Sequence, residues 1–281
     1  MGITSFEPGA RVGDYRLDAF LGEGATGLVF KGSPLSDPGR AVALKILRAE
    51  RTLDAVAHAR FAREARLAQG IDSPHIVPIL DLTESHGVTF LVMPFYEIGS
   101  LARRLRTVER LTLDETVELA AQLGRGLDAL HARHIVHRDV KPSNVLLDLA
   151  GVAALADFGL AIATDSTRLT ADGQVLGTPH YLAPELIEGR DATEASDVYA
   201  LGCLLYECVA GRPPFAGRNP AEVAFAHLTD PPPDPREVRS ELPGQIADAL
   251  LFALDKDPSK RPTSATALSR MLHVAHRAAP A

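Results

Sequence analysis

The first part of the chain alternates between hydrophobic and polar residues, which is the period of a half-buried strand. The alternation is clearest over residues 15–21. Similar strand-like runs, separated by turn residues, follow at 29–30, 41–47, 75–81 and 88–95. Between them, the apolar residues of 53–69 recur at a helical spacing, and Gly70 stands where a helix commonly ends. We therefore predict a small antiparallel sheet with one helix.

From about residue 96 the spacing of apolar residues becomes helical, and the strand-like runs shrink to short stretches such as 145–147. Thr112 and Glu115 have the spacing of a capping box, which predicts a helix that runs to about His131. Further helices are predicted at 195–210, 221–228, 244–254 and 264–276.

Together these patterns predict an α+β fold of two lobes, a small one of antiparallel strands with one helix and a larger, mainly helical one. We assign residues 14–95 to the first lobe and 96–276 to the second. Residues 1–13 are expected to be a poorly ordered lead-in, and 277–281 a short tail.

Composition narrows the functional classes. The 281 residues are 46% hydrophobic and 23% charged, which is ordinary for a globular protein with a sizeable core. The formal net charge is −7, so no general positive field favours nucleic acid as a partner. Glu207 interrupts the apolar run 198–209, which is too short to span a membrane. Cys203 and Cys208 lie in that run and are predicted to be reduced core thiols.

Gly22, Gly24 and Gly27 follow the first predicted strand. Glycines at this spacing let backbone N–H groups approach a phosphate with no Cβ atom in the way. A dinucleotide-binding loop would continue into a helix, whereas residues 28–31 have the pattern of a second strand. Taken alone, the motif fits an ordinary glycine-rich hairpin turn equally well.

Lys45 lies within an otherwise apolar predicted strand. A buried ammonium group is costly unless a carboxylate or a phosphate compensates its charge. Glu64, in the following predicted helix, would supply such a carboxylate. The simpler alternatives are a lysine at a sheet edge that reaches water and a solvated glutamate on an arginine-rich helix.

A polar segment at residues 137–144 groups an acid, a base, an amide and two cations. Loops with this much charge normally reach solvent, so a hydrophilic connection is the simple alternative. Three motifs follow: Asp157-Phe158-Gly159, Ala183-Pro184-Glu185, and Asp197 ahead of an apolar helix. A turn residue at Asp157 and a helix N-cap at Asp197 are the corresponding alternatives.

In this order, the glycines, Lys45, Glu64, the 137–144 segment and the later motifs resemble the signature set of protein kinases. The resemblance covers about residues 15–275 and is to bacterial serine/threonine protein kinases of the eukaryotic-like, or Hanks, type. It implies the bilobal protein-kinase fold and ATP-dependent transfer of the γ-phosphate to Ser or Thr hydroxyls of proteins, with autophosphorylation. Two alternatives stay open: a nucleotide-binding pseudokinase or scaffolding module, and a small-molecule phosphotransferase on the same fold.

The resemblance gives the polar residues tasks in phosphate transfer. Asp139 would orient the substrate hydroxyl and accept its proton, and Lys141 would neutralise the γ-phosphate. Lys45 would pair with the α- and β-phosphates of ATP and would itself be held by Glu64.

ATP and Mg²⁺ are the cofactors that the resemblance implies, with Mn²⁺ as an alternative cation. The oxygens of Asn144, which is also counted among the catalytic residues, and of Asp157 would bind the metal. The hinge would run over residues 94–96, where Pro94 keeps its carbonyl but has no amide to donate. The residues expected to contact ATP are Leu21, Gly22, Gly24, Gly27, Val29, Ala43, Lys45, Met93, Pro94, Tyr96 and Leu146.

Arg138 directly precedes the catalytic aspartate, as in kinases that are switched by phosphorylation of the activation loop. We predict Thr170 as the modified residue, with Thr167 as the alternative, because a phosphate there would pair with Arg138. Thr178 resembles the threonine of the substrate platform that contacts the catalytic loop. Structural roles are implied for Phe158, Gly159, the pair Glu185 and Arg261, and Asp197, which would hold the catalytic-loop backbone.

The partners implied are proteins that carry Ser or Thr, and dimerisation through the smaller lobe is common in the family. The His, Cys and carboxylate residues show no zinc-site spacing. The first residues lack the features of a secretory signal. We therefore expect the chain to work in the cytosol, by itself or as the cytosolic part of a longer membrane-anchored protein.

Overall fold

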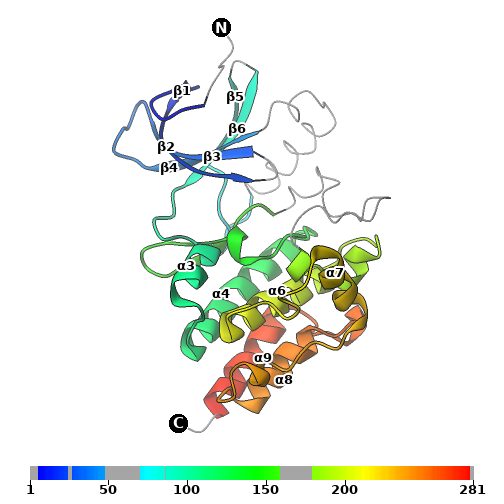
Figure 1. Cartoon of the computed structure of the whole chain (residues 1–281). Coiled ribbons are helices and arrows are strands. Elements are labelled where there is room, and N and C mark those ends of the chain that lie inside the picture. Colours follow the sequence, from blue (N-terminus) through cyan, green and yellow to red (C-terminus); the bar gives the residue numbers. More distant parts are fainter. Residues whose placement is uncertain (1–5, 25–26, 48–69, 86, 159–178, 279–281) are drawn as a thin grey trace. The chain divides into compact units, whose positions relative to one another are not determined.

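The computed structural model of the chain describes residues 6–24, 27–47, 70–85, 87–158 and 179–278 (Figure 1). These residues form two compact units. The strand unit contains the described residues up to Asp72 together with 77–97, and the helical unit contains 73–76 and the described residues from Ile98 onward. The predicted α+β class, with one strand-rich and one mainly helical lobe, is confirmed.

Within the described residues, the strand unit is an antiparallel sheet of six strands in the order β1-β2-β3-β4-β6-β5. β2 and β3 form a hairpin in which Gly24 pairs with Gly27. Gly27 has to be glycine, because a Cβ atom there would lie 1.9 Å from the carbonyl oxygen of Ile46. The strands are β1 Arg11–Val12, β2 Tyr15–Gly24, β3 Gly27–Pro34, β4 Val42–Leu47, β5 Asp81–Ser85 and β6 Val88–Pro94.

The alternation of the strands places an apolar core on one face of this sheet. Val42, Leu44 and Ile46 of β4 are at most 1% exposed. The neighbouring strands add Val12, Leu17, Phe30, Phe90 and Val92 to the same cluster. The residues of β4 between them, Ala43 and Lys45, therefore point to the opposite face.

The helical unit combines short strands with a series of helices (Figure 1). β7, β8 and β9 form a small antiparallel sheet in that order. Four short 3₁₀ turns lie at Pro142–Asn144, Pro179–Tyr181, Pro235–Glu237 and Pro258–Lys260 within the described residues. The other elements are β7 Gly99–Ser100, α3 Leu101–Val108, α4 Leu113–His131, β8 Val145–Leu147, β9 Ala153–Leu155, α5 Pro184–Ile187, α6 Glu194–Ala210, α7 Pro220–Thr229, α8 Gly244–Ala253 and α9 Ala265–Ala278.

The predicted capping box starts α4. The hydroxyl of Thr112 accepts the N–H of Glu115 at 3.2 Å, and the Glu115 carboxylate accepts the N–H of Thr112 at 2.8 Å. Further along α4, the carboxylate of Asp128 accepts the N–H groups of Ala265 and Thr266, each at 3.2 Å. These bonds satisfy the first amides of α9 and hold that helix against α4.

Helix α6 is buried along nearly its whole length. Cys203 and Cys208 are 0% exposed and free, so the prediction of reduced core thiols is confirmed. Burial raises the pKa of both thiols, which keeps them protonated and unreactive. Thr193 caps the start of α6, and Gly211 ends it in the left-handed conformation at φ 77°.

Two sequence predictions about the N-terminal part of the chain are wrong. The expectation of a poorly ordered lead-in is wrong for residues 6–13, because β1 pairs with β2 there and Phe6 packs against the core; residues 1–5 lie outside the described part of the chain. Residues 75–81 were expected to be a strand, but β5 begins only at Asp81. Pro78 has no N–H to donate to a neighbouring strand, and Ile76 makes a single bridge to Leu155 in the helical unit.

The predicted helix at 53–69 lies outside the described residues. α9 continues to Ala278, two residues beyond the end expected for the second lobe. In the ranges that the structure describes, no helix has the length and hydropathy of a membrane-spanning segment.

Candidate active site

The charged segment 137–144, the candidate catalytic loop, is bound to helix α6 through one buried carboxylate. Asp197, 1% exposed, accepts the N–H of His137 at 2.8 Å and that of Arg138 at 2.9 Å. His131, in the last turn of α4, contacts the same carboxylate through Nε2 at 2.8 Å. Thr193 is the N-cap of α6, so the simple reading of Asp197 as a helix cap is wrong. Its role is to hold the start of the loop.

His137 is a buried, neutral support for this loop. Burial lowers its pKa more than the nearby Asp197 and Asp139 carboxylates raise it. The N–H of Asp139 donates to Nδ1 of His137 at 3.3 Å, which leaves the ring proton on Nε2. Its ring packs edge-on against Phe158 at 6.2 Å between centroids. His137 therefore fixes the backbone on both sides of Arg138.

Asp139, Lys141 and Asn144 form one hydrogen-bonded constellation. Lys141 Nζ lies 2.7 Å from Asp139 Oδ2. Asn144 Nδ2 donates to the same oxygen at 2.8 Å and to the Asp139 carbonyl at 2.9 Å. The side chains of Lys141 and Asp139 are 33% and 30% exposed, so the pair is accessible to a substrate. The alternative of a merely hydrophilic connection does not explain this convergence.

Two residues that flank this constellation have left-handed backbone conformations. Arg138 has φ 70° and Asp157 has φ 61°. Such conformations cost a non-glycine residue about 1–3 kcal/mol and gather at functional sites. The N–H of Ala156 donates to the carbonyl of Asn144 at 2.8 Å, which brings the next residue, Asp157, beside Asn144. The backbone thus places Asn144 close to the residue that precedes Asp157.

Asn144 and Asp157 fit a divalent cation. Asn144 uses both amide hydrogens on Asp139, so among the described residues its Oδ1 is left with a single 3.4 Å contact from the Ser143 hydroxyl. Amide and carboxylate oxygens are the ligands that Mg²⁺ takes in proteins, together with phosphate oxygens and water.

In the strand unit, several residues predicted to contact ATP share the face opposite the core. Gly22 pairs with Val29, Val29 pairs with Lys45, and paired residues lie on one face. A Cβ atom on Gly22 would meet nothing within 4 Å, and one on Gly24 would meet a single atom at 3.9 Å. Packing within the described residues therefore does not require glycine at either position, whereas close approach of a ligand would.

Lys45 is 3% exposed and lies on β4, between β3 and β6. The alternative of an edge lysine that reaches water is therefore excluded. Ala43 and Met93, each 8% exposed, pair directly on the same face, which suits an apolar slot. Pro94 ends β6, and Leu21 stands at a bulge of β2 with 48% of its surface exposed.

Of the remaining predicted contacts, Leu146 is half-buried on β8 in the helical unit, and Tyr96 follows β6 in the strand unit. Five predicted residues lie outside the described part of the chain: Glu64, Gly159, Thr167, Thr170 and Thr178.

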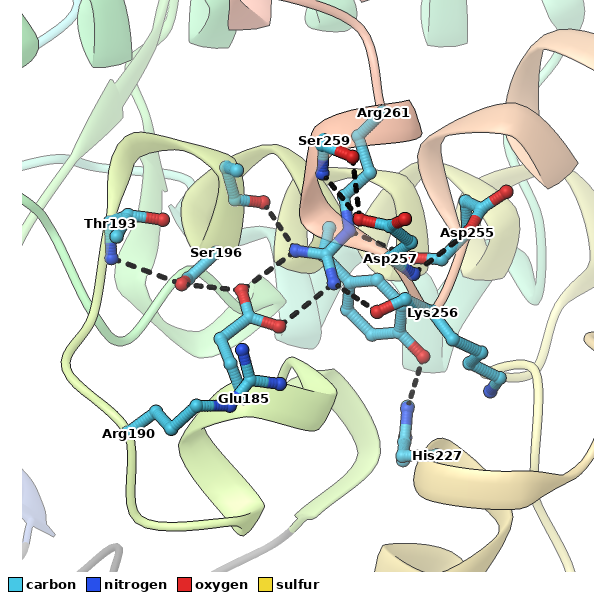
Figure 2. Close-up of polar contacts among 12 residues, drawn as sticks. Glu185, Arg190, Thr193, Ser196, His227, Asp255, Lys256, Asp257, Ser259 and Arg261 are labelled. Carbon is cyan, nitrogen blue, oxygen red and sulfur yellow. Dashed lines mark hydrogen bonds and ion pairs between the residues drawn. The ribbon is translucent and has the colours of Figure 1, made fainter.

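Glu185 and Arg261 form a buried ion pair (Figure 2). Arg261 donates from Nη1 and Nη2 to the two carboxylate oxygens of Glu185 at 2.7 and 2.8 Å, and the Ser196 hydroxyl adds a third bond at 2.7 Å. Burial raises the pKa of Glu185, but the bonds from Arg261 and Ser196 outweigh it and lower the pKa overall. The guanidinium also stacks over the Tyr199 ring at 4.8 Å. This network joins α5, α6 and the segment before α9.

Sequence reasoning missed His131. In the sequence, His131 is notable only as the expected last residue of a predicted helix. Its partner, Asp197, lies 66 positions further along the chain. The available signal was a histidine in the last turn of a helix that leads directly into the charged segment.

Comparison with known proteins agrees with this geometry. Serine/threonine-protein kinase PknD of Mycobacterium tuberculosis is 38% identical over 254 residues, which are 90% of this chain and 38% of that protein. Serine/threonine-protein kinase PknE of M. tuberculosis is 36% identical over 98% of this chain and 48% of its own length. For PknA of Corynebacterium glutamicum the identity is 37%, over 88% of this chain and 53% of that protein. The chain thus spans about half or less of these relatives.

The crystal structure of the M. tuberculosis PknI kinase domain matches with a TM-score of 0.76 at 26% identity, over 96% of this chain and 100% of that one. The family model of the protein kinase domain matches residues 15–272. Because that match covers nearly the whole sequence, the chain belongs to the protein kinase family.

Proposed function

We propose that the chain is an ATP-dependent serine/threonine protein kinase. The observation that carries the proposal is the constellation of Asp139, Lys141 and Asn144, which Asp197 anchors while two of its side chains remain about one-third exposed. Relatives named serine/threonine-protein kinases support Ser and Thr as acceptors.

Asp139 has one carboxylate oxygen available for chemistry. Lys141 and Asn144 both contact Oδ2, and Oδ1 makes no hydrogen bond to another described residue. Oδ1 would accept the proton of the substrate hydroxyl as its oxygen bonds to the γ-phosphorus and the bond to the β-phosphate oxygen breaks, releasing ADP. Lys141 would balance the negative charge that gathers on the transferred phosphate.

ATP and Mg²⁺ extend the proposal to the remaining residues. Asn144 Oδ1 and Asp157 would hold the cation, which when bound neutralises phosphate charge. Glu64 would hold Lys45, and Lys45 together with the open faces of Gly22 and Gly24 would receive the phosphates. The apolar pair Ala43 and Met93, Leu21, Val29, Leu146 and the hinge residues Pro94 and Tyr96 would bind adenine.

We also propose that phosphorylation of Thr170 or Thr167 activates the chain. Arg138 has a buried Nε that lacks a hydrogen-bond partner among the described residues. A phosphate would supply acceptor oxygens for that guanidinium and so bind the phosphorylated segment to Arg138. Thr178 would then complete the platform for the protein substrate.

The test is phosphate transfer from labelled ATP, with Mg²⁺, to three peptides that differ only in a Ser, Thr or Tyr acceptor. We expect transfer to the Ser and Thr peptides and none with the Asp139→Asn variant. Asp191→Asn, which removes an exposed carboxylate of the same unit, serves as the matched control and should keep activity. Nucleotide binding without transfer would identify a pseudokinase, and transfer to a small alcohol but to no peptide would change the substrate class.

A further inference from the structure

A cavity of about 780 Å³ lies beside the catalytic loop in the helical unit. Lys141 and Ser143 line it, and Lys141 Nζ is 2.7 Å from the Asp139 carboxylate. A substrate whose hydroxyl reaches Asp139 therefore carries its neighbouring side chains close to this cavity. The chemistry of its walls can select among substrates.

Two arginines of the cavity wall, Arg106 and Arg110, have few or weak contacts with acidic groups among the described residues. Arg106 lies in the last turn of α3, is exposed, and makes no hydrogen bond or ion pair with another described residue. Arg110 has a 3.7 Å contact with Glu241, an exposed pair of the kind that contributes little to stability. A guanidinium presents donors at the spacing of carboxylate or phosphate oxygens, so both arginines are suited to an anionic side chain.

The carboxylates of the cavity compensate this charge only in part. Glu207 accepts the hydroxyl of Tyr181 at 2.5 Å, and burial raises its pKa against the lowering effect of that bond. Glu109 is exposed at the end of α3. The loop contributes Ser143, which adds no negative charge. Of the three cations in the lining, Lys141 is paired with Asp139, and among the described residues the Arg110 side chain makes only the long contact with Glu241. Arg106 and, in part, Arg110 are therefore the positive charges of the wall that an anionic side chain can meet.

We propose that this cavity selects protein substrates with an anionic side chain close to the acceptor Ser or Thr, and that Arg106 and Arg110 bind that side chain. The inference rests on the proposed kinase activity and names the substrate class of that same site.

The first experiment measures kcat/KM of the full chain for peptides that differ at one position near the acceptor. Each position on either side is filled in turn with Glu, Gln, Lys or phosphoserine. At the position that meets the cavity we expect Glu to exceed Gln by about tenfold, through a lower KM, and the preference to weaken as salt rises. A still stronger preference for phosphoserine would identify phosphate as the anion, and an equal or weaker one a carboxylate.

The second experiment reverses the charge of the wall. Arg106→Glu, alone and with Arg110→Glu, should turn the preference for Glu into one for Lys. Arg103→Glu is the matched control, because Arg103 is exposed on the same helix but does not line the cavity. The ratio of kcat/KM values for Glu and Lys peptides is the readout, since it is insensitive to a uniform loss of activity.

Three results would overturn the inference: equal use of Glu, Gln and Lys at every position, a preference for Lys in the unaltered chain, or the same change from Arg103→Glu as from Arg106→Glu. Failure of the kinase proposal is distinguishable, because then no peptide of any charge would be phosphorylated. In that case, fluorescence polarisation with Ala-for-Ser peptides still tests the charge preference of the cavity.

Discussion

The catalytic loop and the Glu185–Arg261 network both contain an ion pair, but the two pairs differ in exposure. Asp139 and Lys141 are 30% and 33% exposed, whereas Glu185 and Arg261 are 3% and 0% exposed. An exposed pair contributes about 0–1 kcal/mol, so a substrate can displace it at little cost. Breaking a buried pair leaves an uncompensated charge and costs about 3–5 kcal/mol. The difference in exposure thus indicates that Asp139 and Lys141 can exchange partners, whereas Glu185 and Arg261 stabilise the fold.

Asp139→Asn should have the largest effect on activity and almost none on stability. Loss of the proton acceptor is expected to slow phosphate transfer by about a hundredfold to ten-thousandfold. The free energy of unfolding should change by less than about 1 kcal/mol, because the amide oxygen of Asn can still accept the bond from Asn144 and the pair with Lys141 is partly exposed. Single-turnover kinetics and urea unfolding measure the two quantities. If the urea midpoint of Asp139→Asn fell together with its activity, the Asp139–Lys141 pair would also support the fold, and the proposed difference from the Glu185–Arg261 pair would be wrong.

Arg261→Ala should show the opposite behaviour, with a loss of about 3–5 kcal/mol in the free energy of unfolding. It removes both bonds to Glu185 and leaves that carboxylate buried with Ser196 as its remaining side-chain donor. Arg236→Ala is the control, since Arg236 pairs with Asp234 at the surface and should leave the melting temperature unchanged. Equal shifts in the two variants would contradict the assignment.

His227 should make stability depend on pH. Burial, with smaller contributions from Lys256 and His180, lowers its pKa to about 3, and its Nδ1 lies 2.7 Å from the Tyr199 hydroxyl. Below pH ~6.5 the unfolded chain takes up a proton that the folded chain does not, so this site removes up to about 1.4 kcal/mol per pH unit as pH falls toward 3. Melting temperatures between pH 7.5 and 5.5 should fall less steeply in His227→Gln. If the melting temperatures of the two proteins fell in parallel with pH, His227 would not contribute to the pH dependence of stability.

Thr112→Ala should lower the free energy of unfolding by about 1 kcal/mol through loss of the capping box of α4, which is less than the loss expected for Arg261→Ala. Thr107→Ala is the control, because its hydroxyl only bonds back to the carbonyl of Arg103 on the helix surface. Urea midpoints at an unchanged slope measure both. A loss from Thr107→Ala as large as that from Thr112→Ala would argue against the cap.

Local patterns predicted the elements well because their causes are local. The capping pair Thr112 and Glu115, the alternation along β2 and the glycine hairpin all act within a few residues. The strand predicted at 75–81 failed because Ile76 pairs with the distant Leu155. Contacts such as this one depend on tertiary structure, which periodicity does not record.

The candidate site shows the same division. The order of motifs identified Asp139, Lys141 and Asn144, but not the shared oxygen Oδ2 on which their side chains converge. Arg138 and Asp157 have left-handed backbone conformations, but neither position is a glycine, which is the usual sequence signal of such a conformation. The cavity with Arg106 and Arg110 unites residues from α3, the catalytic loop and α6, so sequence spacing could not reveal it.

The intact mass of the full chain after incubation with ATP and Mg²⁺ tests the central claim most directly. We predict that the chain gains the mass of one or more phosphates, which peptide mapping assigns to Thr170 or Thr167, while Asp139→Asn gains none and unfolds at the same urea concentration. Phosphate on the Asp139→Asn chain at the rate of the unaltered one would show that the exposed pair does not perform the transfer.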